Sequence, residues 1–137
     1  MVRPSPFLLL SLVGCRGLTG TWEGTLLCLD RAATITGDAT LVLAPDGGGE
    51  WVGEMQAVGD YQTATVGGDM VVGWSVQVER TRPAGRQALD GIVDDCVVYL
   101  DGLLYTEDCF DDQLTWTWDG ADTLTMQGPI CELTATR

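Results

Sequence analysis

Apolar and polar residues alternate with a period of two along most of this chain, and turn-forming residues interrupt the alternation every eight to fourteen residues. Leu114, Trp116 and Trp118 fall on one face of such a segment, for example, and the two threonines between them fall on the other. This pattern is typical of a half-buried β-strand. Because no segment shows a convincing helical period, we expect an all-β fold.

Ten short segments show the strand pattern, and the sequence predicts a total of about eight to ten strands. They cover residues 21–28, 34–44, 51–55, 61–66, 74–79, 97–100, 103–106, 114–118, 123–126 and 130–136. Asp101-Gly102 is a strong signal for a two-residue hairpin. Tight turns favour an antiparallel meander, and closure into a barrel of about eight strands would protect its edges. A β-sandwich is the alternative fold.

The first fifteen residues form a separate segment. A positive start at Arg3 leads into an apolar run over residues 7–13, which is too short to cross a bilayer and indicates a secretory signal peptide. The run ends in Leu12-Val13-Gly14-Cys15, which closely resembles the lipobox of bacterial lipoproteins. The resemblance implies cleavage before Cys15 and lipidation of its thiol. An ordinary signal peptide with a chance cysteine is the alternative.

We therefore expect a signal peptide at residues 1–14, a short tether at 15–19 and a single domain at 20–137. A mature chain of 123 residues is long enough for one hydrophobic core.

Four cysteines remain once Cys15 is assigned to the lipid. They are Cys28, Cys96, Cys109 and Cys131. A secreted chain with an even number of cysteines favours disulfides, whereas zinc would need close cysteine pairs or histidines, which this sequence lacks. First and last strands touch in a closed meander, so we expect Cys28 to pair with Cys131. Cys96 and Cys109 flank the predicted hairpin, and their pairing requires a bulge or a frayed strand end.

The two ends of the expected domain carry a further resemblance. Gly20-Thr21-Trp22 opens the first strand and Arg137 follows the last one, which is similar to the pattern of the lipocalins and the wider calycin superfamily. The resemblance implies a lipocalin-like barrel in which Arg137 packs across the Trp22 ring as a structural pair. Such a pair gains about 1 kcal/mol and closes one end of the barrel, so a ligand would enter from the other.

Composition excludes several functions. The chain has no histidine and no lysine, which removes the usual serine, cysteine and lysine nucleophile arrangements, so we expect no enzyme and no cofactor. The net charge of −13 disfavours nucleic acid and anionic lipid head groups as partners. Acyl chains on Cys15 would then hold the protein to the membrane. The acidic run at 107–112 lacks any known calcium spacing, and we expect a solvated loop there and no metal.

Four large residues besides Trp22 are the candidate ligand contacts. They are Trp51, Trp74, Trp116 and Trp118. We expect them to fill most of the interior and to leave room for at most a small apolar ligand. The expected function is therefore binding of a small apolar ligand by a lipid-anchored protein of the bacterial cell envelope. Arg16 after the cysteine is not acidic, which by resemblance favours the outer membrane. A module that binds an envelope protein, or a barrel of the protease-inhibitor kind, is the alternative.

Overall fold

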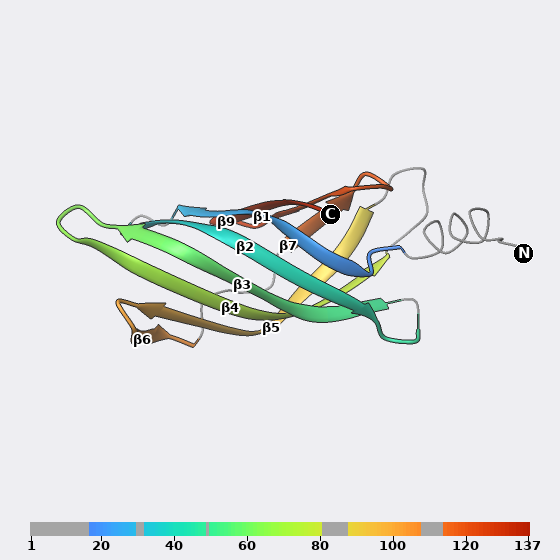
Figure 1. Cartoon of the computed structure of the whole chain (residues 1–137), viewed down its shortest axis with the longest axis horizontal. Helices are drawn as coiled ribbons and strands as arrows, with labels where there is room; N and C mark the ends of the chain where they lie inside the picture. The colour runs from blue at the N-terminus through green and yellow to red at the C-terminus, as the bar shows by residue number, and fades with distance from the viewer. Residues whose placement is uncertain (1–16, 30–31, 49, 81–87, 108–113) are drawn as a thin grey trace, which may run out of the picture.

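The computed structural model describes residues 17–29, 32–48, 50–80, 88–107 and 114–137 (Figure 1). Nine strands form one antiparallel sheet in this part of the chain. They are β1 (Gly20–Leu29), β2 (Thr34–Pro45), β3 (Glu50–Gln62), β4 (Gly67–Arg80), β5 (Ala88–Leu100), β6 (Leu103–Thr106), β7 (Leu114–Trp118), β8 (Thr123–Gln127) and β9 (Cys131–Thr136). The predicted all-β antiparallel meander is confirmed. No helix in the described ranges is long and apolar enough to cross a membrane.

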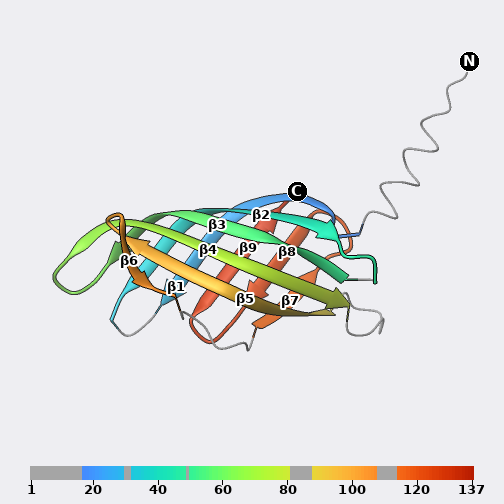
Figure 2. The same ribbon diagram turned by 90° about the horizontal axis from the view of Figure 1, so that it is seen from below.

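Strand order follows the chain except where β1 pairs with β9 and where β7 pairs with β5 instead of with β6. The order is β4-β3-β2-β1-β9-β8-β7-β5-β6, so β1 and β9 are neighbours although they lie at opposite ends of the chain. Strand β5 also pairs with β4 along almost its whole length. Its other edge pairs with β7 through residues 88–91 and with β6 through residues 98–100. Figure 2 shows β8 and β9 behind β3, β4 and β5, so the sheet wraps around its buried face.

The buried face is built by the alternation seen in the sequence. Strand β9, for example, alternates strictly between buried and exposed residues, and β7 does the same. The side chains that alternate inward form one hydrophobic cluster, and no polar or charged residue of the described chain is buried. All acidic side chains of known burial therefore remain in contact with water, where their charge costs little.

Several strand bounds expected from the sequence are wrong, since β3, β4 and β5 are much longer than the expected strands 51–55, 74–79 and 97–100. Residues 61–66 do not form a separate strand, because Tyr61 continues β3 and the turn begins at Thr63. The Thr63 hydroxyl accepts a hydrogen bond from the backbone N–H of Val66 at 2.9 Å, which stabilises that turn. Gly67 then begins β4. The sequence signal was ambiguous because glycines that lie inside strands resemble those in turns.

Gly91 shows the same ambiguity. The Asp90-Gly91 pair resembles a turn in the sequence but lies inside β5. A Cβ atom at Gly91 would lie 1.9 Å from Nε1 of Trp116. The residue is therefore a glycine because an indole ring covers it, and not because the chain turns there.

Candidate functional site

One end of the wrapped sheet is filled by the pair expected from the ends of the domain. Trp22 is fully buried, and the Arg137 guanidinium lies 4.3 Å from the centre of its ring. The guanidinium also donates to three backbone carbonyls, those of Gly17 at 2.7 Å, Thr19 at 2.9 Å and Ala121 at 2.7 Å. Arg137 therefore joins the start of β1 to the end of β9 and to the turn between β7 and β8. A planar group with several fixed donors suits such a contact.

Residues 17–19, which we expected to belong to a tether, pack against this same end. Leu18 is fully buried in the core, and its carbonyl accepts a hydrogen bond of 2.9 Å from Nε1 of Trp22. The indole ring of Trp51 lies over Gly17, where a Cβ atom would be only 2.6 Å from the ring. The packed part of the described chain thus begins by residue 17, and these side chains fill this end of the sheet.

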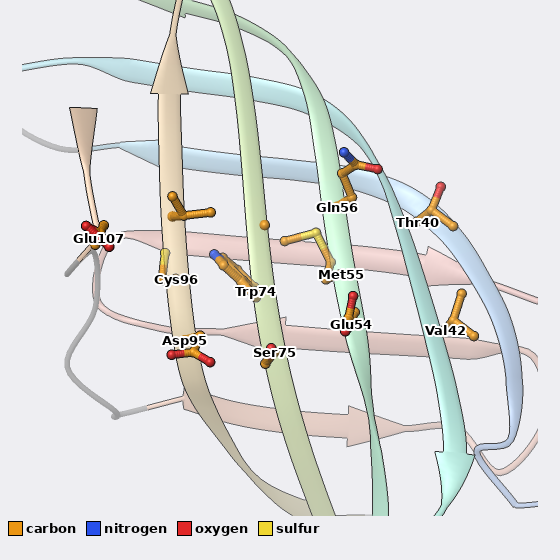
Figure 3. A pocket seen from close by; sticks show the side chains of 12 residues that line it. Thr40, Val42, Glu54, Met55, Gln56, Trp74, Ser75, Asp95, Cys96 and Glu107 are labelled. Carbon is orange, nitrogen blue, oxygen red and sulfur yellow. The ribbon is translucent and has the colours of Figure 1, made fainter. Parts of the chain in front are cut away.

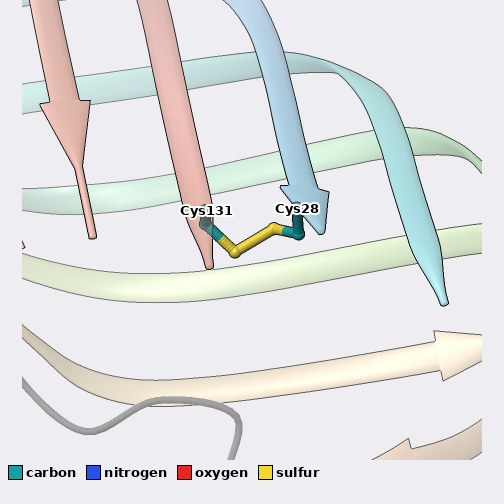
Figure 4. The surroundings of a disulfide bond; sticks show 2 residues. All are labelled: Cys28 and Cys131. Carbon is teal, nitrogen blue, oxygen red and sulfur yellow. A yellow bond between two sulfur atoms is a disulfide. The ribbon is translucent and has the colours of Figure 1, made fainter. Parts of the chain in front are cut away.

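The opposite end of the sheet is tied by a disulfide. Cys28 and Cys131 are direct partners in the β1–β9 register, and their sulfur atoms are bonded (Figure 4). The predicted Cys28–Cys131 pairing is confirmed. Cys96 is also disulfide-bonded. Its expected partner, Cys109, lies outside the described residues, so that pairing stays a prediction. A bulge between Val98 and Tyr99 shifts the β5–β6 register in the direction that the pairing requires.

Beside this disulfide the buried face encloses a hollow of about 560 Å³. Its walls come from seven strands, β1 to β6 and β9, and from residues of the adjoining loops. Most of the wall is apolar, and it includes the disulfide, Ile35, Val72, Trp74, Val98 and Leu100. The polar groups in the lining are hydroxyls, among them those of Tyr61 and Tyr105. A concave, mostly apolar site with a few polar groups is the usual form of a small-molecule site.

A hydrogen-bonded group borders this hollow. Asp101 occupies the turn between β5 and β6 with a φ of 52°, a conformation that aspartate tolerates and that a two-residue hairpin requires. Its carboxylate accepts hydrogen bonds from the Tyr61 hydroxyl at 2.9 Å and from the backbone N–H of Asp69 at 3.0 Å. A Cβ atom at Gly68 would lie 2.3 Å from the same carboxylate. Asp101 therefore fastens the hairpin to the ends of β3 and β4.

The same contact affects the ionisation of Tyr61. The hydrogen bond to Asp101 raises the pKa of the Tyr61 phenol above its ordinary value, and burial and the negative charge of Asp101 add to the effect. Tyr61 consequently stays protonated and keeps donating to Asp101 throughout the physiological pH range.

The tryptophans that we expected to contact a ligand lie in different places. Trp74 lies in the wall of the hollow. Trp116 is fully buried beneath Gly91, and Trp118 donates from Nε1 to the Ala121 carbonyl at 3.2 Å. Neither of these two residues lines the hollow, and Trp51 covers Gly17 at the other end. The expectation of a mostly filled interior therefore describes one end of the sheet, while the disulfide end is hollow.

A second depression of about 650 Å³ lies mainly on the exposed face of β2 to β5 (Figure 3). Exposed polar side chains predominate along it, among them Thr40, Glu54, Gln56, Asp95 and Glu107. No group of three potential metal ligands occurs in the part of the chain that the structure describes. Water-exposed carboxylates around an open trough are compatible with simple solvation, so the apolar hollow is the candidate binding site.

Comparison of the chain with protein-family models, with curated proteins and with solved structures finds no match. The function is therefore argued from the chemistry of the site alone.

Replacing Arg137 tests the packed end of the sheet. Arg137→Ala should lower the free energy of unfolding by about 2–4 kcal/mol, because it removes a cation–π contact and three hydrogen bonds. Arg137→Lys should recover only part of this loss, since an ammonium lacks the planar fork. Urea unfolding followed by tryptophan fluorescence measures both values. Glu132→Gln, at an exposed position of β9, is the control with an expected change below about 0.5 kcal/mol. An Arg137→Ala protein as stable as the control would contradict this account.

Removing the disulfide tests the hollow end. The Cys28→Ala/Cys131→Ala protein should lose about 3–5 kcal/mol of stability, because the bond closes a loop between residues that are 103 positions apart. Urea unfolding should show a lower midpoint and a somewhat steeper slope, because the unfolded chain without the bond is less compact and exposes more surface. An unchanged midpoint would mean that the pairing of β1 with β9 does not depend on the bond.

Proposed function

We propose that this protein is a bacterial envelope lipoprotein, anchored through acyl chains on Cys15, whose domain is a closed lipocalin-like barrel that binds a small apolar ligand. The observation that carries the binding function is the apolar hollow of about 560 Å³ beside the Cys28–Cys131 disulfide. This volume is in the range of small-molecule sites, which is about 300–1,000 Å³. The proposal includes no catalytic step, no cofactor and no nucleic acid.

Closure of the sheet is supported by the strand pairings. Each strand pairs with the next in the order β4, β3, β2, β1, β9, β8, β7 and β5. Strand β5 then pairs with β4, the first strand of this series. Strand β6 is then an additional strand on one edge of β5. A β-sandwich, the alternative fold, would instead leave two sheets with free edges. Closed barrels of about eight strands hold either packed side chains or one small ligand.

The different packing of the two ends supports a single entrance. Trp22, Arg137 and Leu18 fill one end, whereas the hollow lies among Cys28, Cys131 and the ends of β3 and β5. A ligand would therefore enter at the disulfide end. Its body should be apolar, because the wall offers mostly hydrocarbon and sulfur atoms.

The position of the anchor follows from the sequence and the packed end. Cys15 precedes Gly17 by two residues, and the Gly17 carbonyl accepts a hydrogen bond from Arg137. Acyl chains on Cys15 would therefore place the filled end at the membrane surface. Trp22 and Cys28 are separated by about 20 Å along β1, so the entrance would face away from that membrane. Arg16 keeps the outer membrane as the proposed location.

Mass spectrometry tests the anchor. The chain expressed with its own first fourteen residues in a bacterium that processes lipoproteins should lose residues 1–14 and carry acyl mass on Cys15. The Cys15→Ser chain should carry none and should leave the membrane fraction. A mature protein that begins at another residue, or an unmodified Cys15, would disprove the anchor.

Ligand binding is tested with the Cys15→Ser domain. Calorimetric titration with dodecanol, supported by native mass spectrometry, should give saturable binding with one molecule per domain. Val98→Trp fills the hollow and should weaken binding at least tenfold. Val58→Trp adds the same bulk at an exposed position of β3 and should leave binding unchanged. Binding that ignores the Val98→Trp change would place the ligand elsewhere, and no binding at all would reject the ligand-binding function.

The second candidate function is binding of an envelope protein, and one observation favours it. Leu103 and Tyr105 on β6 are 74% and 66% exposed, and Leu104 between them is 52% exposed. β6 pairs only with β5 among the described strands. Exposed apolar residues on a strand with a free edge are a common docking surface for proteins. If the domain binds no apolar probe, this candidate replaces the first.

A further inference from the structure

The lining of the hollow is uncharged. Among the described residues that form it, the side chains are hydrocarbon, sulfur, indole or hydroxyl groups, and none is basic. The two basic residues of the described chain lie toward the other end of the sheet. Arg137 covers Trp22, and Arg80 is the last residue of β4, whose earlier residues Val72 and Trp74 line the hollow. An acidic head group inside the hollow would therefore find no positive partner among these residues.

Asp101 places a negative charge one hydrogen bond away from the lining of the hollow, although it is not itself a lining residue. Tyr61 is almost completely buried, its ring lines the hollow, and its hydroxyl donates to Oδ2 of Asp101 at 2.9 Å. Both groups that bond to the Asp101 carboxylate are donors, as an ionised carboxylate requires. Each carboxylate oxygen can accept a further hydrogen bond, so Asp101 retains capacity for a ligand group beside the Tyr61 hydroxyl.

Neighbouring charges strengthen this field. Asp60 and Asp69 are exposed partners in the β3–β4 register at the same end of the sheet. Asp30 and Arg31, which lie outside the described residues, precede Ala32 of the lining and carry one charge of each sign. The chain as a whole carries −13. The potential at the entrance is therefore negative, which favours cations and repels anions.

We propose that the hollow selects its ligand by charge, taking an apolar chain with a cationic, hydrogen-bond-donating head and rejecting the same chain with a carboxylate head, with Asp101 as the acceptor of the head group. This inference rests on the proposed ligand-binding function. The chemical class that it names is the alkylammonium amphiphile. An uncharged alcohol should bind with intermediate affinity, because its hydroxyl can donate to Asp101 without a charge.

Three probes with one common chain test the selection. Dodecylammonium, dodecanol and dodecanoate are titrated into the Cys15→Ser domain by calorimetry at neutral pH, physiological salt and concentrations below micelle formation. A charge close to a carboxylate at the protein surface should change affinity by about tenfold for each step of charge. We therefore expect dodecylammonium to bind about tenfold more tightly than dodecanol, and dodecanoate to bind about tenfold more weakly.

Asp101→Asn identifies the residue responsible. Asparagine has nearly the same shape and tolerates the positive φ of this turn, so the fold should persist. The advantage of dodecylammonium over dodecanol should fall to about threefold or less, while the affinity for dodecanol stays unchanged. Asp46→Asn is the matched control. It removes the same charge from the exposed turn between β2 and β3, toward the opposite end of the sheet, and should leave the preference intact.

The outcomes separate this inference from the function on which it rests. If no probe binds, ligand binding fails and charge selection is rejected with it. If dodecanoate binds as tightly as dodecylammonium, the hollow remains a ligand site and charge selection alone is overturned. If Val98→Trp leaves dodecylammonium binding intact, the ammonium adsorbs to the acidic surface, which also overturns the proposal. If Asp101→Asn keeps the full preference, Asp101 is not the acceptor.

Discussion

The antiparallel contact between β1 and β9 is the interaction on which the rest of this structure depends. It joins two segments from opposite ends of the domain, and it is tied at both of its ends. Arg137 crosses from the end of β9 onto Trp22 of β1, while the disulfide joins Cys28 to Cys131. Without this contact, β1 and β9 would each present a free edge, and the side chains on the buried face would lose one wall of their enclosure.

The Arg137 contact and the disulfide differ in chemistry, and the two ends of the domain are packed differently as a result. Arg137 acts through hydrogen bonds to three carbonyls and through the face of an indole, so it holds residues 17–19 against this end of the sheet. The disulfide is a small covalent link that lies in the wall and leaves the hollow beside it open. In the proposed lipoprotein, the filled end would sit at the membrane and the hollow would face the aqueous compartment.

In the proposed ligand site, the acidic composition of the chain would set the charge around the open end. No charged residue of known burial enters the core, so the charges lie around the site rather than inside it. Asp101 differs from the other acidic residues because it is hydrogen-bonded to a residue that lines the site. Its partner is the hydroxyl of Tyr61, which is 40 residues away in the chain. In the proposed ligand site, negative charge at the entrance would discriminate among head groups while the uncharged wall would bind the apolar chain.

The sequence by itself determined the all-β meander and, through cysteine number and strand order, the Cys28–Cys131 disulfide. Period-two alternation and turn residues are local properties, so they can be recognised without knowledge of the partner strands. The same local signal was wrong at residues 61–66 and at Gly91. Residue type alone does not distinguish a glycine that packs under a ring, as Gly91 does under Trp116, from a glycine in a turn. Only the tertiary structure decided that Trp74 faces the hollow while Trp116 and Trp118 do not line it, and that Tyr61 meets Asp101. A hollow is the space left where the side chains of seven strands meet. Its size depends on residues far apart in the chain, so it cannot be recognised from the pattern of any one strand.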